Sequence, residues 1–478
     1  MTSITFETFS NVIDGKLVAT TDTRHGINPA NQQLLPPVPV STSDDVDRAV
    51  DAAKRAAPGW AQTPISERRE KMVQFSRAIS SHSEGFANML VLEQGKPLDF
   101  AKREANIAAS LLEGCSKLNF EEEFVVQDTD SRRIVTRYVP VGVSVGIVPW
   151  NFPVSLTIVK LGPALLAGSP IILKPSPFTP YAGLKIVELA QQFFPPGVVQ
   201  ALSGDDSLGP MLTAHPGIDH VSFTGSTQTG IKVMQSCAPT LKRVTLELGG
   251  NDPAIICADV DIATVAPKVA ALAFANSGQV CVAIKRVYVH SSIYKEFLTA
   301  MTNYVKTFVV GDGLNQSTTM GPVQNSMQYE KLKQLVASIE EGNLKIATGD
   351  IKTTFPDGKG YFMNPVIVDN PPDSSKIVVE EPFGPALPVM QWDTEEEVVR
   401  RANDSESGLG ASVWSRDITQ ANRIGNQIQA GNIWINTHLE LQANAAFGGH
   451  KRSGIGAELG VDGVKAYCNV QTIYQAKL

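Results

Sequence analysis

The pattern of apolar and polar residues predicts that this chain folds from helices and parallel strands. Between residues 42 and 118, apolar residues recur at the three- and four-residue spacing of amphipathic helices, and Thr42 is placed to cap the first helix. We expect Pro58-Gly59 to end that helix and Gly95-Lys96-Pro97 to end the next one. This part of the chain is therefore predicted to be helical.

Between residues 143 and 250, short apolar runs alternate with helical stretches. The five runs are Val143–Val148, Ile171–Leu173, Val198–Leu202, His220–Phe223 and Val244–Leu248. Strands joined through helices favour right-handed crossovers and a parallel, doubly wound sheet. Such sheets bind ligands at the carboxyl ends of their strands, so the residues that follow these runs are predicted to line one crevice.

A second alternation after residue 250 predicts another α/β domain. Its strand candidates are Ala254–Ile256, Arg286–Val289, Ala411–Trp414 and Asn432–Ile435. Two further segments, Arg132–Val141 and Tyr467–Tyr474, alternate like exposed strands. We interpret the first as an arm and expect the second to pair elsewhere.

Composition and charge exclude several classes of protein. The chain has 478 residues, 43% of them hydrophobic, which is enough for two or three cores. Its net charge is −7 and its basic residues are scattered, so no nucleic-acid partner is predicted. No apolar run reaches the ~20 residues of a membrane span, and no membrane partner is predicted either. The five cysteines form no CxxC pair, so we predict no metal site and a reducing compartment.

The two ends of the chain bear on its location. The first residues lack the basic start and apolar stretch of a secretory signal, so a cytoplasmic location is predicted. The C-terminal Ala476-Lys477-Leu478 is a conservative variant of the Ser-Lys-Leu peroxisomal address, which leaves a peroxisomal location as the alternative.

Three residues are candidates for chemistry, although each also fits a structural role. Cys281 follows a turn of small residues, so its thiol can face a cleft, but a cysteine in an apolar neighbourhood is usually inert. Glu247 ends a predicted strand before Gly249-Gly250, where a ligand can approach closely. Asn151 lies in a rigid turn that can fix its amide as a hydrogen-bond donor.

Two further features suggest a phosphate-bearing ligand. The stretch Gly225–Gly230 leaves a strand and opens a helix, where backbone N–H groups can meet a pyrophosphate. Lys174 ends another strand and can bond ribose hydroxyls or a phosphate. The alternatives are that the turn needs its glycines only for steric reasons and that Lys174 is a solvated surface residue.

Seven short motifs follow one another along the chain. They are Pro149–Pro153, Lys174–Ser176, Phe223–Ser226, Glu247–Gly250, Gly278–Cys281, Glu381–Pro385 and Phe447–Gly454. In this order they resemble the aldehyde dehydrogenase superfamily, and the resemblance extends from about Gly26 to the last strand.

The resemblance implies a fold and an assembly. We predict two doubly wound Rossmann-like α/β domains, one that binds the cofactor and one catalytic, with a small β arm for oligomerisation. The predicted boundaries are residues 1–123 and 142–249 for the dinucleotide-binding domain, 250–445 for the catalytic domain, and 124–141 with 464–478 for the arm. The arm alternates apolar and polar residues like an exposed edge strand, which agrees with a homodimer or homotetramer.

The resemblance also implies a reaction, the NAD(P)-dependent oxidation of an aldehyde to a carboxylic acid. Cys281 would attack as thiolate to form a thiohemiacetal, which loses hydride and becomes a thioester. The Asn151 amide and the Cys281 N–H would hold the oxyanion, and Glu247 would activate the hydrolytic water. A carboxylate at this motif position favours hydrolysis over acyl transfer to coenzyme A.

For the cofactor, the resemblance assigns residues to each part of the dinucleotide. They are Lys174 with Ser176 at the adenosine ribose, Trp150, Gly225 and Ser226 at the pyrophosphate, Glu381 at the nicotinamide ribose and Phe383 at the nicotinamide end. Pro177 stands where many NAD-preferring relatives carry glutamate, and a proline cannot repel a 2′-phosphate. We therefore predict NAD or NADP as cofactor, with NAD favoured.

For the substrate, the resemblance assigns an apolar tunnel to Phe152, Leu156, Val159, Leu441 and Phe447. These residues favour an uncharged aliphatic or aromatic aldehyde as the small-molecule partner. His438 and Glu440 lie in the same loop, and a semialdehyde dehydrogenase of the same family is the alternative. A cysteine hydrolase and a non-catalytic binding protein on this scaffold are the other hypotheses.

Overall fold

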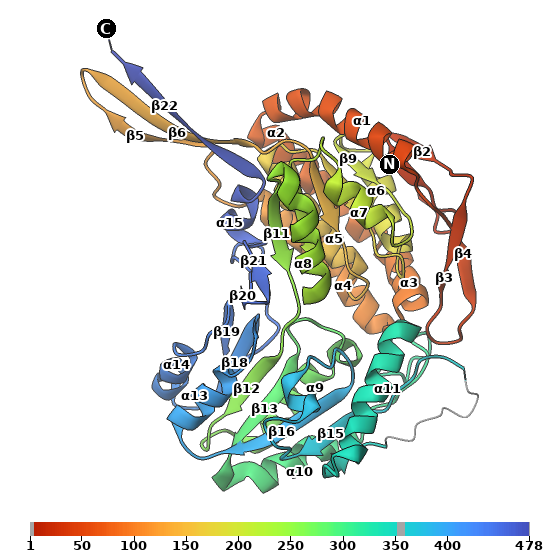
Figure 1. The fold of residues 1–478 in the computed structure, drawn as a ribbon, viewed down its shortest axis with the longest axis vertical. Helices are drawn as coiled ribbons and strands as arrows, with labels where there is room; N and C mark the ends of the chain where they lie inside the picture. The colour runs from red at the N-terminus through yellow and green to blue at the C-terminus, as the bar shows by residue number, and fades with distance from the viewer. Residues whose placement is uncertain (1–3, 351–358, 478) are drawn as a thin grey trace.

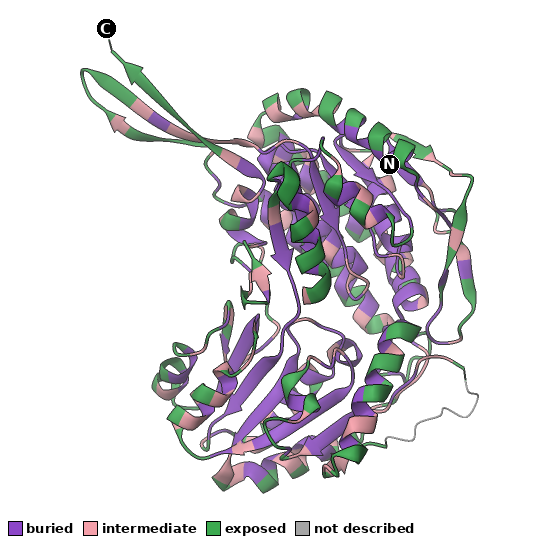
Figure 2. Ribbon diagram, in the orientation of Figure 1, coloured by how far each residue is buried: buried purple, intermediate pink, exposed green. Residues whose placement is uncertain are grey.

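The computed structural model describes residues 4–350 and 359–477, which form two lobes and a projecting arm (Figure 1). Each lobe is built around a mostly parallel sheet with helices packed against it. The strands of both sheets are largely buried, whereas the arm is largely exposed (Figure 2). The predicted α/β fold class is therefore confirmed.

The first lobe contains an eight-stranded sheet with the order β2-β1-β9-β8-β7-β10-β11-β21. The strands are β1 (Asn11–Ile13), β2 (Lys16–Val18), β7 (Ser144–Ile147), β8 (Ile171–Lys174), β9 (Val199–Ala201), β10 (His220–Thr224), β11 (Arg243–Glu247) and β21 (Gly454–Ile455). The five strands predicted between residues 143 and 250 are β7 to β11, and they pair in parallel. Parallel pairing places Lys174 beside Ile147 and Glu247 beside Thr224, so the strands end at one edge of the sheet.

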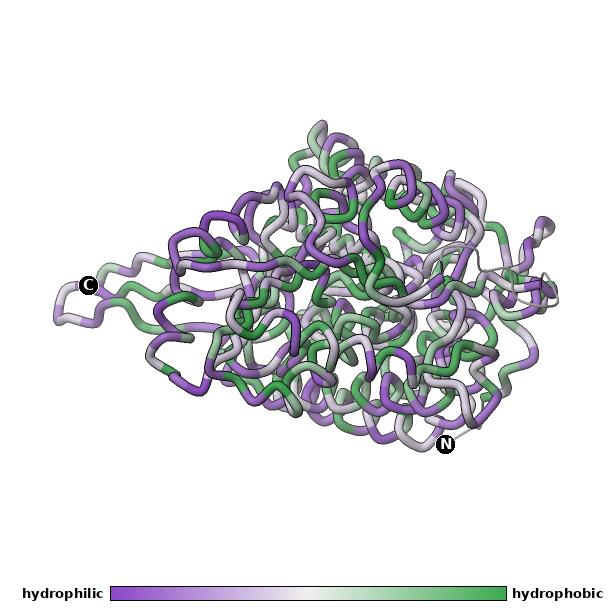
Figure 3. The backbone as a smooth tube through the Cα atoms, turned by 90° about the horizontal axis from the view of Figure 1, so that it is seen from below, coloured by the Kyte–Doolittle hydropathy of each residue, from purple (hydrophilic) through white to green (hydrophobic). Residues whose placement is uncertain are grey.

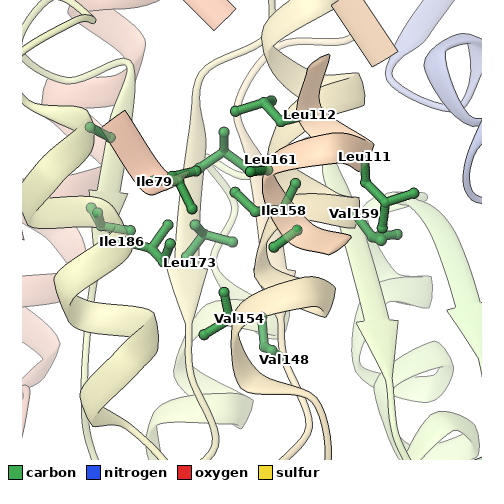
Figure 4. Packing of buried hydrophobic residues seen from close by; sticks show 14 of the residues in the cluster. Ile79, Leu111, Leu112, Val148, Val154, Ile158, Val159, Leu161, Leu173 and Ile186 are labelled. Atoms are coloured by element: carbon green, nitrogen blue, oxygen red, sulfur yellow. The ribbon is translucent and has the colours of Figure 1, made fainter. Parts of the chain in front are cut away.

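Nine α-helices of the described residues belong to this lobe. They are α1 (Ser43–Gln62), α2 (Ile65–Ser81), α3 (Ser83–Gln94), α4 (Leu98–Ser116), α5 (Pro153–Ala167), α6 (Tyr181–Ala190), α7 (Leu208–Ala214), α8 (Thr227–Cys237) and α15 (Gly460–Lys465). Side chains from α2, α4, α5 and α6 interdigitate with β8 in the largest core (Figure 4). This packing fixes α5, whose first turn follows the Asn151 loop.

The predicted start of α1 is confirmed, whereas its predicted end is not. Thr42 caps the helix as predicted, and its side chain and that of Asp45 form a capping box. The prediction that Pro58-Gly59 ends the helix is wrong, since α1 continues through Pro58 to Gln62. Trp60, in the turn beyond the proline, is 1% exposed, so its burial offsets the hydrogen bond that proline removes.

The second lobe contains a seven-stranded sheet with the order β14-β15-β16-β13-β12-β18-β19. Its strands are β12 (Asp252–Ile256), β13 (Ile284–His290), β14 (Ile346–Thr348), β15 (Val366–Asp369), β16 (Ala386–Trp392), β18 (Gly410–Trp414) and β19 (Asn432–Ile435). Four of them were predicted, whereas β14, β15 and β16 were not. Pro388 lies inside β16, and a proline in an apolar run argues against a strand.

Helices pack against the second sheet and cover its core. They are α9 (Ile262–Ala273), α10 (Tyr294–Val305), α11 (Ser326–Glu341), α12 (Lys376–Val379), α13 (Glu395–Asn403) and α14 (Ile418–Gly425). Hydrophobic segments gather in the body of the molecule, from which the arm extends (Figure 3). No helix of the described residues is long and apolar enough to cross a membrane.

The arm is a three-stranded antiparallel sheet with the order β22-β6-β5 (Figure 1). It consists of β5 (Glu123–Asp128), β6 (Arg132–Pro140) and β22 (Cys468–Ala476). Residues predicted from their alternation to be strands thus pair with each other, with Val135 opposite Ile473. Leu478, the last residue of the C-terminal tripeptide, lies outside the described residues. The domain boundaries given above stay a prediction.

Two small two-stranded sheets complete the structure. They are β3 (Thr23–Ile27) with β4 (Leu34–Pro39), and β17 (Ser407–Gly408) with β20 (His450–Lys451). The first of these sheets lies along the outer side of the first lobe (Figure 1).

Candidate active site

The turn before Cys281 has an unusual backbone. Asn276 and Ser277 adopt left-handed φ values of 50° and 58°, and Gly278 follows at 73°. A Cβ on Gly278 would lie 2.2 Å from the carbonyl oxygen of Gly384, so only glycine fits between this turn and the 381–385 segment. The strain is held by tertiary contacts such as the Ser277 hydroxyl, which donates to the Gly321 carbonyl at 2.8 Å. Strained turns of this kind cluster at functional sites.

Asn151 lies beside this turn although 130 residues separate it from Cys281 in the sequence. It follows β7 in the first lobe and is buried. Its side-chain Nδ2 donates to the Gln279 carbonyl at 3.0 Å, and its backbone carbonyl accepts from Asn276 Nδ2 at 3.3 Å. The Asn151 carboxamide therefore bonds to a residue that lies two positions before Cys281 in the sequence.

The five cysteines, all within the described ranges, differ in exposure. Cys281 is partly exposed, whereas the other four are buried and none forms a disulfide. Burial of the thiol raises the pKa of Cys281 to about 12, and the nearby Lys285 opposes this rise. Cys281 also packs against the core that contains Val159 and Phe447. Cys281 is therefore the least buried of the five cysteines.

Glu247 ends β11 and is buried, so the surface carboxylate weighed from the sequence is excluded. Neither of its carboxylate oxygens has a hydrogen-bond partner among the described residues. Burial and the nearby Glu458 raise the pKa of Glu247 well above 4.5, and Lys160 opposes them. A buried carboxyl group without partners is costly to the fold, which makes it a candidate for function.

Lys160 and Glu458 were not singled out from the sequence. The Lys160 ammonium donates to Glu458 at 2.7 Å, to Thr224 at 2.8 Å and to Ser222 at 2.9 Å, and both charged side chains are buried. The available signal was a lysine in the middle of α5, a helix with no other charged residue. This pair supplies the charges that face Glu247.

Lys174 lies at the end of β8, as predicted. It is 6% exposed, and within the described part of the chain its ammonium reaches only the Pro175 carbonyl, at 3.5 Å. Burial lowers the pKa of Lys174 to about 8. Arg24, which was not predicted, lies nearby and donates to the carbonyl oxygens of Pro177 and Gly204. A buried ammonium with no carboxylate bound to it fits an incoming polar ligand.

The glycine-containing turn after β10 leads into α8, as predicted. Ser226 caps this helix by accepting from the Thr229 N–H at 3.3 Å. Gly225 is required because a Cβ there would lie 2.5 Å from the Phe223 ring. The helix N-terminus therefore presents its backbone donors at the same sheet edge as Lys174.

Glu381 and its neighbours connect the two lobes at Cys281. Glu381 accepts from the Gly250 N–H at 3.2 Å and pairs with Lys285 at 3.1 Å. Lys285, which the sequence reasoning missed, also donates to the Cys281 carbonyl. Phe383, at a left-handed φ of 47°, packs edge-on against Trp150 with ring centroids 5.3 Å apart. Ser176 is buried, and its hydroxyl accepts from the Phe178 N–H.

Four of the five predicted tunnel residues lie in one apolar cluster with Cys281. They are Phe152, Leu156, Val159 and Phe447. Leu441 instead lines a cavity of about 730 Å³, together with Leu111 and Val461. Leu111 packs beside Val159, so this cavity adjoins the cluster (Figure 4).

Two polar residues of the same loop, His438 and Glu440, are not among the residues that line this cavity. His438 is buried, and its Nε2 donates to the Val282 carbonyl at 2.7 Å. Burial lowers the pKa of His438 to about 3, so the ring is neutral. Glu440 is exposed and accepts from the Thr437 hydroxyl at 2.6 Å.

A sequence profile described as the aldehyde dehydrogenase family matches residues 18–473. The chain belongs to the aldehyde dehydrogenase family. It is 38% identical to an aldehyde dehydrogenase from a Fusarium species, over 99% of this chain and 100% of that protein. This family membership confirms the resemblance found in the seven motifs and the predicted class of enzyme.

Solved structures of other aldehyde dehydrogenases superpose on this family member throughout. An NADP-dependent enzyme from E. coli matches with a TM-score of 0.95 at 32% identity, over 99% of both chains. Aldehyde dehydrogenase C from Pseudomonas syringae, solved with NAD+ and octanal, matches with a TM-score of 0.94 at 32% identity, over 98% of this chain and 96% of that one. These relatives support the predicted choice of NAD or NADP.

Proposed function

We propose that this aldehyde dehydrogenase oxidises an uncharged aliphatic or aromatic aldehyde to the carboxylic acid, with Cys281, Asn151 and Glu247 as its catalytic residues. The observation that carries the proposal is the hydrogen bond from the Asn151 amide to Gln279. It brings a carboxamide donor from one lobe to a residue two positions before the cysteine in the other. The amide of Asn151 and the N–H of Cys281 would together hold an oxyanion formed at the thiol.

In the first step the Cys281 sulfur, as thiolate, bonds to the carbonyl carbon of the aldehyde. The carbonyl π electrons move to oxygen, and the Asn151 Nδ2 and the Cys281 N–H donate to the resulting oxyanion. One such donor contributes about 3 kcal/mol to the transition state. Because burial raises the pKa of Cys281 to about 12, the thiol must first lose its proton, which leaves to solvent with Glu247 assisting as a base.

The residues around the sheet edge fit a nicotinamide dinucleotide. Lys174 offers a buried ammonium that forms no ion pair with any described residue, α8 offers its N-terminal N–H groups, and Glu381 offers a carboxylate for ribose hydroxyls. When bound, NAD or NADP supplies the acceptor for the hydride that the tetrahedral carbon releases. Trp150 and Phe383 would exclude water beside that carbon, where the collapse of the oxyanion leaves a thioester on Cys281.

In the last step a water molecule attacks the thioester carbon, and Glu247 accepts the proton that the water loses. The carbon–sulfur bond then breaks, which releases the acid and regenerates the Cys281 thiolate. The raised pKa of Glu247 makes it a stronger base than an exposed carboxylate. Burial raises the pKa of Glu247 most; the charge of Glu458 raises it further, and that of Lys160 lowers it.

The apolar cluster around Cys281 and the adjoining cavity support an uncharged substrate. The test is a panel of aldehydes of graded length and charge, run with NAD and with NADP, while reduced nicotinamide is followed by absorbance. We expect the highest kcat/KM for uncharged aliphatic or aromatic aldehydes. A maximum for a carboxylate-bearing semialdehyde would reject the substrate class, and no turnover of any aldehyde would reject the activity.

Pro177 is proposed to leave room for a 2′-phosphate beside Lys174. In Pro177→Glu, a carboxylate would accept from ribose hydroxyls and repel the phosphate, so the ratio of kcat/KM for NADP to that for NAD should fall about tenfold, or roughly 1.4 kcal/mol. Pro177→Ala is the matched control, since it adds no charge and should leave the ratio near that of the unchanged enzyme. An unaltered ratio in Pro177→Glu would mean that this position does not face the 2′ carbon.

The arm is proposed to join copies of the chain into a homodimer or homotetramer. Apolar side chains on it are exposed in the single chain, among them Phe124, Val470 and Ile473. Ile473→Asp should lower the mass measured by sedimentation toward that of one chain, because a charge would be buried in the interface. Met327→Asp, on an exposed position of α11, should not change the mass. If the unchanged protein already sediments as one chain, the assembly proposal is wrong.

A further inference from the structure

A buried ion pair lies directly under the Asn151 loop. Lys96 is in the turn between α3 and α4, and Glu104 is on α4. The two side chains form an ion pair, and both are 0% exposed. Burying two charges is costly unless every donor and acceptor finds a partner, so the remaining partners of the pair show what it holds.

Besides its ion pair, the Lys96 ammonium contacts the Asn151 loop at two points. It donates to Glu104 and, at 3.0 Å, to the backbone carbonyl of Asn151. It also lies 4.2 Å from the centre of the Phe152 ring, within the range of a cation–π interaction. One buried cation thus contacts two successive residues, the proposed oxyanion donor and a proposed wall of the substrate tunnel.

Glu104 holds the other side of the same loop. Helix α5 begins at Pro153, which has no N–H, and its N-cap residue Phe152 makes no side-chain capping bond. Glu104 Oε1 accepts instead from the Val154 N–H at 3.0 Å and from the Ser155 N–H at 3.2 Å. The Glu104 carboxylate, on α4, therefore caps α5 and accepts hydrogen bonds from two backbone N–H groups of its first turn.

The Asn151 carbonyl receives a second donor from the opposite lobe. Asn276 Nδ2, in the strained turn before Cys281, reaches it at 3.3 Å. With its backbone held from both sides, Asn151 has its amide directed at Gln279, 3.0 Å away. A shift of about 1 Å in such a group is enough to cost roughly 100-fold in rate.

We propose that Lys96 and Glu104 are a positioning pair, which fixes the backbone of Asn151 so that its amide faces the oxyanion formed at Cys281. The inference rests on the proposed function, because it needs Asn151 as oxyanion donor. Neither Lys96 nor Glu104 touches the reacting atoms, so both act through the loop that they hold.

The test is a double-mutant cycle on the rate of the first turnover, read as the burst of reduced nicotinamide. Lys96→Met should slow the burst by about tenfold or more while changing the KM for NAD little. In an Asn151→Ala background the same substitution should slow it by less than about twofold, because the donor that it positions is gone. Equal losses in both backgrounds would overturn the proposal.

A second variant separates positioning from stability. Lys96→Met combined with Glu104→Gln removes both charges, and the glutamine oxygen can still accept from α5, so we expect thermal stability to recover. The burst should stay slow, since no donor reaches the Asn151 carbonyl from this side. A purely structural role predicts that rate and stability recover together, which would also overturn the proposal.

Lys185 is a matched control. It is a buried lysine that pairs with Glu188 at 2.6 Å and lies 5.2 Å from the Phe9 ring centre, but it is on α6, away from Cys281. Lys185→Met should leave the burst rate unchanged. If Asn151→Ala itself has a normal burst, the oxyanion role in the proposed function fails; if Asn151→Ala is slow and Lys96→Met is normal, only the positioning pair fails.

Discussion

Replacing Cys281 with serine is expected to lower aldehyde turnover by about 10⁴-fold or more, while binding of NAD stays near that of the unchanged enzyme. A serine hydroxyl has a far higher pKa than a thiol and is a poorer nucleophile without a dedicated base. An ester formed on serine would also lose its leaving group less readily than a thioester. Steady-state rates and equilibrium binding of reduced nicotinamide measure the two parts of this prediction.

Cys257→Ser is the control for this experiment. Cys257 is fully buried in the core of the second lobe, so its replacement tests the general effect of a hydroxyl in place of a buried thiol. It should alter stability more than rate. A Cys281→Ser enzyme that keeps normal turnover would reject the nucleophile, and one that loses NAD binding would show that the substitution disrupted the crevice.

Glu247→Gln is expected to slow steady-state turnover by roughly 10²–10⁴, because hydrolysis of the thioester loses its general base. The acyl enzyme should then accumulate, so a pre-steady-state burst of reduced nicotinamide close to one equivalent per site should survive. Glu330→Gln, on an exposed position of α11, is the control and should leave the rate unchanged. Normal turnover without a burst in Glu247→Gln would count against the assigned role.

The raised pKa of Glu247 adds a pH signature to that prediction. As a base it must be deprotonated, so the hydrolysis rate should rise with pH through the raised pKa, and this rise should vanish in Glu247→Gln. The contribution of Glu247 to the stability of the fold changes with pH in the opposite direction and falls as pH rises. A carboxyl whose folded pKa exceeds its unfolded value of 4.5 stabilises the fold fully only below that value, and the contribution is lost as pH rises through the folded pKa.

Glu247→Gln should therefore gain stability relative to the unchanged enzyme as pH rises above about 4.5. Urea unfolding at several pH values measures this difference. A stability difference that does not depend on pH would mean that the carboxyl is not held protonated by its burial.

Local patterns predicted the elements that position the site. The strands β7 to β11 were predicted because short apolar runs between helical stretches are typical of a buried parallel sheet. The thiol, the carboxylate and the amide were each weak signals alone, and their order along the chain made them specific. Lys160, Lys285 and Arg24 were missed because a single lysine or arginine in a sequence usually indicates a solvated surface.

The sequence by itself determined the family, the two α/β halves, the pairing arm and the candidates for the reacting side chains, since all of these depend on local periodicity and short motifs. Only the tertiary structure decided that Asn151 bonds to the turn before Cys281, that neither carboxylate oxygen of Glu247 has a hydrogen-bond partner among the described residues, and that Lys96 and Glu104 contact the Asn151 loop. Distance, burial and charge compensation arise from residues far apart in the chain, and no local pattern encodes them.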